Sequence, residues 1–194
     1  MLSELTSWFE GALVKPISES KAIDLLADIR SRFARAVAAY ETKASKCLEC
    51  PNPGECCVDA HFVNVRITRL EAEAILRYLK TLSSRRYATI RERITRTIDD
   101  FGLVAGSDPD LRTFSCPLFE EGLGCSVHSV AKPLPCLAHA CYESKSDLPP
   151  DDLLTSAEAE IADLNKRVYG SIQLPISLPV AIEARTRAST GSDG

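Results

Sequence analysis

Apolar side chains recur at helical spacing along much of the chain and are interrupted by segments rich in proline, glycine and cysteine. Residues three and four positions apart share one face of an α-helix, so residues 18–44 are predicted to form an amphipathic helix. Arg30, Arg32 and Arg35 are expected mostly outside its apolar stripe. The stripe consists of Ala22, Leu26, Ile29, Phe33, Val37 and Tyr40. A shorter helix ahead of it is indicated by Leu5, Trp8, Phe9 and Ala12.

Two central helices are marked by their ends as well as by their spacing. Thr68 and Glu71 form a capping box, in which each side chain satisfies a backbone amide of the other residue. A helix should therefore run from Thr68 to about residue 82. The apolar spacing over 87–101 predicts a second helix, which should end at Gly102 because glycine readily adopts the left-handed cap conformation.

The remaining pattern adds two C-terminal helices and little β-structure. Helices are expected over 151–169 and near 180–187. Alternation over 63–67 predicts a short strand, and another is expected near 125–128, with a turn of helix after Pro135. The predicted fold class is therefore mainly α: a small helical domain with two cysteine-rich loops and little β-structure.

Length and composition suit one soluble globular domain with extensions, since 194 residues can bury a substantial core. We expect N-terminal helices over 1–45 and a cysteine-cluster metal-binding core over 46–147. A C-terminal helical extension should occupy 148–188, and a disordered tail 189–194.

Charge and hydropathy exclude several classes of partner. The net charge of −4 argues against nucleic acid, so the five arginines within 85–96 are interpreted as a solvated helix face. No segment approaches the roughly 20 apolar residues needed to span a bilayer, which argues against a membrane protein. The first ten residues lack the basic region of a secretory signal and carry acidic residues within their apolar stretch, so we expect the cytoplasm, where thiols stay reduced.

Eight cysteines fall into two groups, which are Cys47, Cys50, Cys56 and Cys57, and then Cys116, Cys125, Cys136 and Cys141. In a reducing compartment such groups are typical of metal ligands rather than of disulfides. The two-residue gap between Cys47 and Cys50 can direct both thiolates at one metal. The adjacent pair Cys56 and Cys57 favours a cluster or a multinuclear site, because neighbouring side chains diverge. All eight cysteines are candidate ligands, and we expect both groups to meet at a shared metal site.

The order of these cysteines and their flanking residues resembles the YkgJ-type cysteine-cluster family, which is described as a zinc- or iron-chelating domain. The match covers residues 47–141 and includes the Thr68–Glu71 helix start, Cys116-Pro-Leu-Phe, Gly124-Cys125-Ser-Val-His128 and Lys132-Pro-Leu-Pro-Cys136. Seven cysteines fall on the family positions, and Cys141 is additional. Three extra residues separate Cys50 from Cys56. The resemblance implies metal binding and no particular reaction.

Three functions remain open on this pattern. We favour an iron–sulfur cluster, in its simplest form [4Fe–4S], for redox or maturation chemistry, because the thiolates exceed the four that such a cluster needs. The alternative is a zinc-binding structural or interaction module, which is favoured by the Cys-x2-His spacing of His128 and His139. A thiol redox enzyme or sensor ranks third, because no βαβ context surrounds Cys47 and Cys50. Catalytic residues, enzymatic activity and any protein partner are left undefined.

Overall fold

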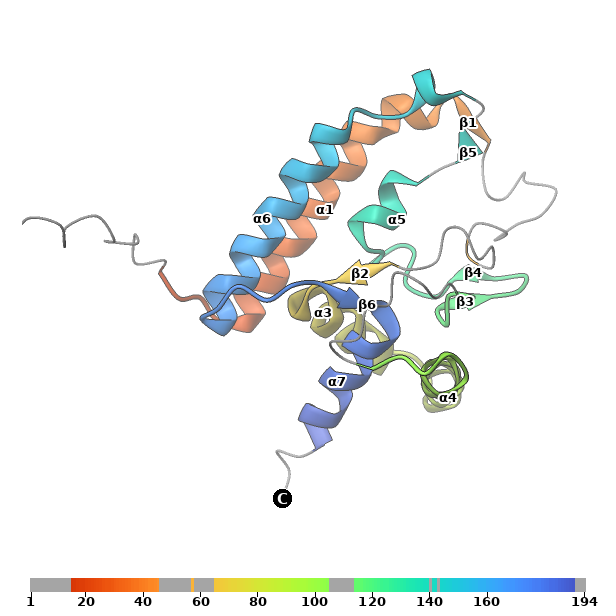
Figure 1. Ribbon diagram of the computed structural model, residues 1–194, viewed down its shortest axis with the longest axis vertical. Helices are drawn as coiled ribbons and strands as arrows, with labels where there is room; N and C mark the ends of the chain where they lie inside the picture. Colours follow the sequence, from red (N-terminus) through yellow and green to blue (C-terminus); the bar gives the residue numbers. More distant parts are fainter. Residues whose placement is uncertain are drawn as a thin grey trace, which may run out of the picture.

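The computed structural model describes residues 15–45, 57, 65–104, 114–139, 141–142 and 144–190 (Figure 1). Of residues 45, 141 and 190, only the backbone is described. The helix predicted around Leu5 lies outside these ranges, as do Cys47, Cys50 and Cys56 and the tail from residue 191 onward.

Helices dominate the described chain, which confirms the mainly α fold class. They are α1 (Glu19–Glu41), α3 (Arg69–Lys80), α4 (Ser84–Phe101), α5 (Leu134–Ala138), α6 (Asp151–Tyr169) and α7 (Leu178–Thr190), with a short 3₁₀ helix at Lys145–Asp147. The helices predicted over 18–44, 68–82, 87–101 and 151–169 are confirmed. The last helix is longer than predicted and includes Ser189 and Thr190, which were expected in the disordered tail.

The strands are two residues long and form antiparallel pairs. These are β1 (Ala44–Ser45) with β5 (Cys141–Tyr142), β2 (Arg66–Ile67) with β6 (Ile176–Ser177), and β3 (Phe119–Glu120) with β4 (Gly124–Cys125). Strand β2 occupies the end of the strand predicted over 63–67. The strand expected near 125–128 is displaced toward the N-terminus, because the chain turns again directly after Cys125.

The helix ends follow the predicted signals. The Glu71 amide donates to Thr68 Oγ1 at 3.2 Å, and the Thr68 amide donates to Glu71 Oε2 at 2.8 Å, which completes the capping box of α3. Gly102 closes α4 with a φ of 56°, in the left-handed region that side chains disfavour.

Helices α1 and α6 lie side by side and enclose one of the two larger apolar cores of the described chain (Figure 1). This α1–α6 core also receives one residue from α3 and one from α5. Its buried members are Ala22, Leu26, Ile29, Phe33, Val37, Leu70, Leu134, Ala157, Ile161 and Leu164. Five of the six positions of the predicted apolar stripe are therefore buried here, which explains why α1 adopts this orientation.

Arg30 departs from the sequence expectation, because it is only 9% exposed. It follows Leu26 by four positions and precedes Phe33 by three, so it lies on the apolar face of α1 rather than beside it.

The second core, the α3–α7 core, lies where α7 packs on α3 and α4. It also contains residues from the segment that carries the second cysteine group. Its buried members are Ile67, Ala72, Ile75, Leu79, Ile90, Ile94, Leu118, Val127, Ala131, Leu178, Ala181 and Ile182. Burying one such side chain contributes about 1.5–3 kcal/mol. The C-terminal helices are thus integral to both cores, and α3 stands between the two.

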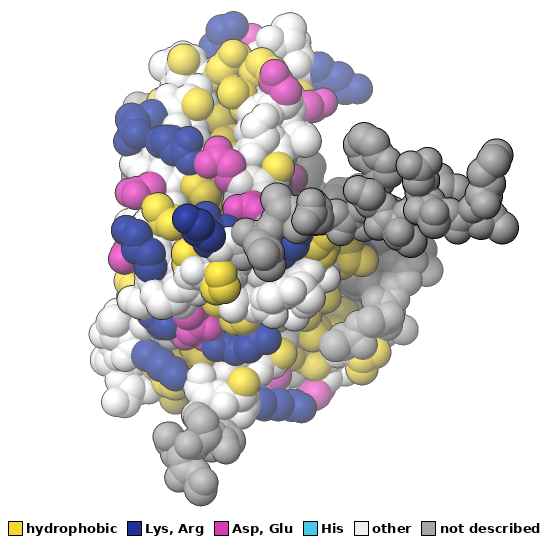
Figure 2. All heavy atoms as spheres, turned by 90° about the vertical axis from the view of Figure 1, so that its left-hand side faces the viewer, with side chains coloured by type: hydrophobic (Ala, Val, Ile, Leu, Met, Phe, Trp, Pro, Cys, Tyr) yellow, Lys and Arg dark blue, Asp and Glu magenta, His cyan; other side chains and the backbone are white. Residues whose placement is uncertain are grey.

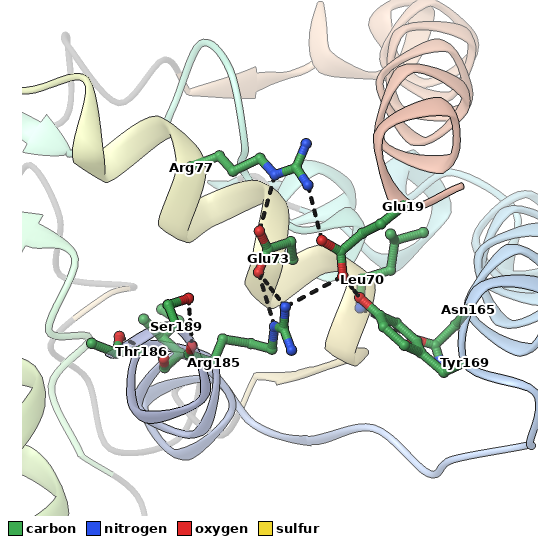
Figure 3. Close-up of polar contacts among 10 residues, drawn as sticks. Glu19, Leu70, Glu73, Arg77, Asn165, Tyr169, Arg185, Thr186 and Ser189 are labelled. Atoms are coloured by element: carbon green, nitrogen blue, oxygen red, sulfur yellow. Dashed lines mark hydrogen bonds and ion pairs between the residues drawn. The ribbon is translucent and has the colours of Figure 1, made fainter. Parts of the chain in front are cut away.

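A polar network joins four helices beside these cores (Figure 3). Glu73 on α3 accepts hydrogen bonds from Arg77 and from Arg185 of α7, each at 2.9 Å. Glu19 at the start of α1 pairs with the same two arginines and accepts from the Tyr169 hydroxyl of α6 at 2.7 Å. This network fixes α1, α3, α6 and α7 relative to one another.

Candidate metal centre

The two cysteine-bearing segments touch through their main chains at two places. The amide of Cys116 donates to the carbonyl of Cys57 at 2.7 Å. In the β1–β5 pair, Cys141 lies opposite Ser45, two residues before Cys47. The last cysteine of the first group is therefore hydrogen-bonded to the first cysteine of the second group. The last cysteine of the second group pairs with the strand that precedes the first group.

Cys116 precedes the hairpin formed by β3 and β4, and Cys125 is the last residue of β4. Gly124, with a φ of 81°, allows the tight turn that brings Cys125 opposite Phe119. The backbone amides of Leu118 and Phe119 act to lower the pKa of Cys116, and the Val127 amide acts in the same direction on Cys125. Amides directed at sulfur favour the thiolate form and are a device by which proteins tune thiolate-bound metals.

Cys136 reaches the same region on the short helix α5. This helix begins after Pro133 and is held by Leu134, which is fully buried in the α1–α6 core. The charges of Cys116 and Cys125 both act on Cys136, and that of Cys125 acts on Cys116. Three thiols that are distant in the sequence are thus electrostatic neighbours in the fold.

Burial makes these thiols weak acids. It raises the pKa of Cys116 to about 11 and that of Cys136 to about 12, and it also raises the pKa of Cys125. Positive charges oppose this effect, from Arg93 at Cys116 and from Lys132 at Cys136. Without metal the thiols stay protonated at neutral pH, so a metal would have to displace their protons.

The remaining candidate ligands are described only in part. Cys57 has helical backbone and is half-buried, and for Cys141 only the backbone is described. Within the described ranges, no group of three or more His, Cys, Asp and Glu side chains is arranged to hold a metal ion. Cys47, Cys50 and Cys56 lie outside those ranges. The donor chemistry of the neighbouring thiols nevertheless fits a thiophilic metal or an iron–sulfur cluster.

The histidines differ from the cysteines in their surroundings. His128 and His139 are exposed, and His61 lies outside the described residues. Burial and then Lys132 lower the pKa of His128, while Glu41 opposes the shift. The position of His128 therefore does not support a role for its imidazole as a metal ligand.

Within the hairpin, Glu120 of β3 accepts hydrogen bonds from cationic and hydroxyl groups. It accepts from Arg86 at 3.3 Å, from Arg93 at 3.4 Å and from Ser126 at 2.7 Å. These contacts fix the arginine face of α4 against the hairpin. Because Arg93 also acts electrostatically on Cys116, this helix contributes positive charge to the cysteine region.

The arginine-rich helix carries few unbalanced charges. Arg91 pairs with Glu183 at 2.7 Å and Arg96 with Glu92 at 2.7 Å, in addition to the two arginines at Glu120. On the face of the molecule shown in Figure 2, basic and acidic side chains are interspersed. Neither observation indicates a continuous basic surface of the kind that tracks a phosphate backbone.

Sequence reasoning did not identify Arg30, Arg93 or Lys132 as part of this region. Arg30 could have been recognised from its spacing to Leu26 and Phe33, whereas Arg93 reaches the thiols only through tertiary packing. Lys132 was noted only as a residue of the family-like motif.

No protein-family model matches the sequence, and neither the curated proteins nor the solved structures contain a significant match to the chain. The resemblance to the YkgJ-type family stays a prediction. Among the described helices, none combines the length and the apolar composition required to cross a membrane.

Proposed function

We propose that the protein binds a metal centre through its cysteines, most simply an iron–sulfur cluster used in redox or maturation chemistry. The observation that carries this proposal is that Cys116, Cys125 and Cys136, all half-buried, act electrostatically on one another, with backbone amides that favour the thiolate form at two of them. Buried thiols without a metal would gain little from such amides, whereas thiolate ligands would be stabilised by them.

The proposed ligand set contains all eight cysteines as candidates, of which the structure describes the side chains of Cys57, Cys116, Cys125 and Cys136. The main-chain bond from Cys116 to Cys57 supports the participation of the first group. The pairing of Cys141 with Ser45 supports a place for Cys141 near that group. A bound cluster would supply one-electron chemistry or serve as cargo in maturation, and the protein would supply thiolates, amide donors and nearby positive charge.

Zinc is the second candidate, in a module that knits the two segments together and supports binding of a protein partner. Four cysteine thiolates could form a closed structural site without a histidine, so the exposure of His128 does not count against zinc. A dithiol redox function ranks third, since it requires a reactive thiol of lowered pKa, and burial raises the pKa of Cys116, Cys125 and Cys136. The proposal places the protein in a reducing compartment such as the cytoplasm.

The deciding experiment is purification of the full chain without oxygen, followed by measurement of iron, acid-labile sulfide, zinc and visible absorbance. Brown protein with matching iron and sulfide supports the cluster. Colourless protein with stoichiometric zinc overturns the cluster and supports the module. Protein that holds neither metal and forms reversible disulfides supports the dithiol function.

A further inference from the structure

Arg30 connects α1 to the loop between Cys125 and Cys136. Its Nε donates to the Lys132 carbonyl at 2.8 Å, and its Nη1 donates to the Val130 carbonyl. Both acceptors are main-chain atoms of one turn, so the guanidinium group bridges two residues in a fixed geometry. Such a two-point contact suits the planar fork of arginine and cannot be reproduced by the single ammonium group of lysine.

The two cysteines that flank this loop are anchored on different cores. Cys125 precedes Val127, which is buried in the α3–α7 core, whereas Cys136 follows Leu134, which is buried in the α1–α6 core. Their separation therefore depends on how the loop over 126–133 spans the two cores. Arg30 is fixed by α1 on one side and bonded to that loop on the other.

The charge of Arg30 also faces the site. Burial lowers the pKa of Arg30, while the charges of Glu71 and then Cys125 oppose that shift. The Glu71 carboxylate is itself buried and already accepts from the amide and the hydroxyl of Thr68. A buried arginine cation is costly unless negative charge lies nearby. A Cys125 thiolate would supply such charge to Arg30, in addition to that of Glu71.

We propose that Arg30 is the positioning residue of the thiol site: it clamps the 126–133 loop so that Cys125 and Cys136 keep the separation that a bound metal centre requires. The clamp itself is independent of any metal. Its effect on metal retention rests on the function proposed above, so the two parts need separate measurements.

The clamp is tested by hydrogen–deuterium exchange of the full chain, with Arg30→Met as the variant and Arg35→Met as the matched control. Arg35 lies on the same helix, is exposed and bonds only Ser31 among the contacts described for it. We expect exchange over 126–133 to be about ten-fold faster in Arg30→Met, because two hydrogen bonds from a charged group are lost. Unchanged exchange in a folded Arg30→Met protein would overturn the clamp.

Arg30→Lys keeps the charge and loses the two-point contact, and it serves if Arg30→Met does not fold. The clamp predicts faster exchange over 126–133 in this variant too, with α6 unaffected. If hydrogen exchange over 126–133 in Arg30→Lys equalled that of the wild type, the positive charge alone would be sufficient. That result would overturn the proposal that the two-point contact positions the loop.

The second measurement is the rate at which a chelator removes the metal from the protein as purified. Loss of residues that orient metal ligands typically weakens metal binding about 10–100-fold, so Arg30→Met should release its metal at least about ten-fold faster than Arg35→Met. Equal release rates overturn the role in metal retention. If the wild type holds no metal, the proposed function fails, while the exchange experiment still decides the clamp.

Discussion

The backbone amide of Cys116 donates a 2.7 Å hydrogen bond to the carbonyl of Cys57, so the two cysteine groups meet through their main chains. If both supply ligands, removing one from either group should empty the site. We expect Cys57→Ser and Cys116→Ser each to lose most of the bound metal, measured as metal per chain after anaerobic purification. Ser129→Ala, in an exposed position of the same segment, should keep it. Full metal content in Cys116→Ser would show that the second group is not a ligand source.

The raised thiol pKa values predict how the metal-free protein responds to alkali. The folded protein holds the protons of Cys116 and Cys136 up to a pH of about 11 and 12, whereas the unfolded chain releases them near 9.0. This contribution to stability is complete below pH 9 and is lost as the pH rises through the folded values. The free energy of unfolding should therefore fall between pH 9 and 11, measured by urea denaturation.

Other groups titrate in the same range, so the control is Cys136→Ala without metal. This variant lacks one of the three thiols whose pKa is raised, and its stability should decline less steeply with pH than that of the wild type. Parallel curves for the two proteins would show that the buried thiol does not contribute.

Glu73 holds two arginines from different helices, and its side chain is only 10% exposed. Glu73→Gln keeps the shape and removes the charge, which leaves Arg185 without its principal partner inside the protein. Breaking a buried ion pair in this way costs about 3 kcal/mol, measured by urea denaturation. Glu92→Gln removes a carboxylate from the exposed pair with Arg96 and should cost less than about 0.5 kcal/mol. Equal losses in the two variants would contradict a central role for Glu73.

Asn165 is 1% exposed, and its Oδ1 accepts from the Leu70 amide at 3.0 Å. That amide lies in the first turn of α3, where no partner within the helix exists. Asn165→Ala should therefore lower the free energy of unfolding by about 1–3 kcal/mol, because a buried donor loses its acceptor. The control, Asp163→Ala, removes an exposed carboxylate from the same helix and should change stability by less than about 0.5 kcal/mol. If Asn165→Ala also changed stability by less than about 0.5 kcal/mol, water would be replacing Asn165 Oδ1 as the acceptor of the Leu70 amide.

The helices were predictable because their signals are local. The capping box at Thr68 and Glu71, Gly102 after α4 and the stripe of α1 each specify structure within a few residues. The strand pairs were harder to predict, since a strand of two residues shows no measurable alternation and its partner is remote in the sequence. The β1–β5 pair, which brings Cys141 beside Ser45, arises only once the helices have packed.

In the cysteine region, too, the local pattern was predictable from the sequence and the tertiary contacts were not. Cysteine spacing indicated which residues to consider, but it could not indicate which of them are electrostatic neighbours. Burial of the thiols depends on Leu118 and Val127, which enter a core built mainly from α3, α4 and α7. Arg30 was misassigned because its charge was weighed more heavily than its position relative to Leu26 and Phe33.

The contribution of α7 to the α3–α7 core has a consequence for synthesis. Leu178, Ala181 and Ile182 are needed to close that core, and they follow every cysteine in the sequence. On the ribosome the thiols therefore emerge while the core that later buries Cys116 and Cys125 is still incomplete. The growing chain therefore passes through a stage in which these cysteines are accessible to solvent. Under the function proposed above, the order of the residues would give a metal centre time to load before the fold closes over the thiols.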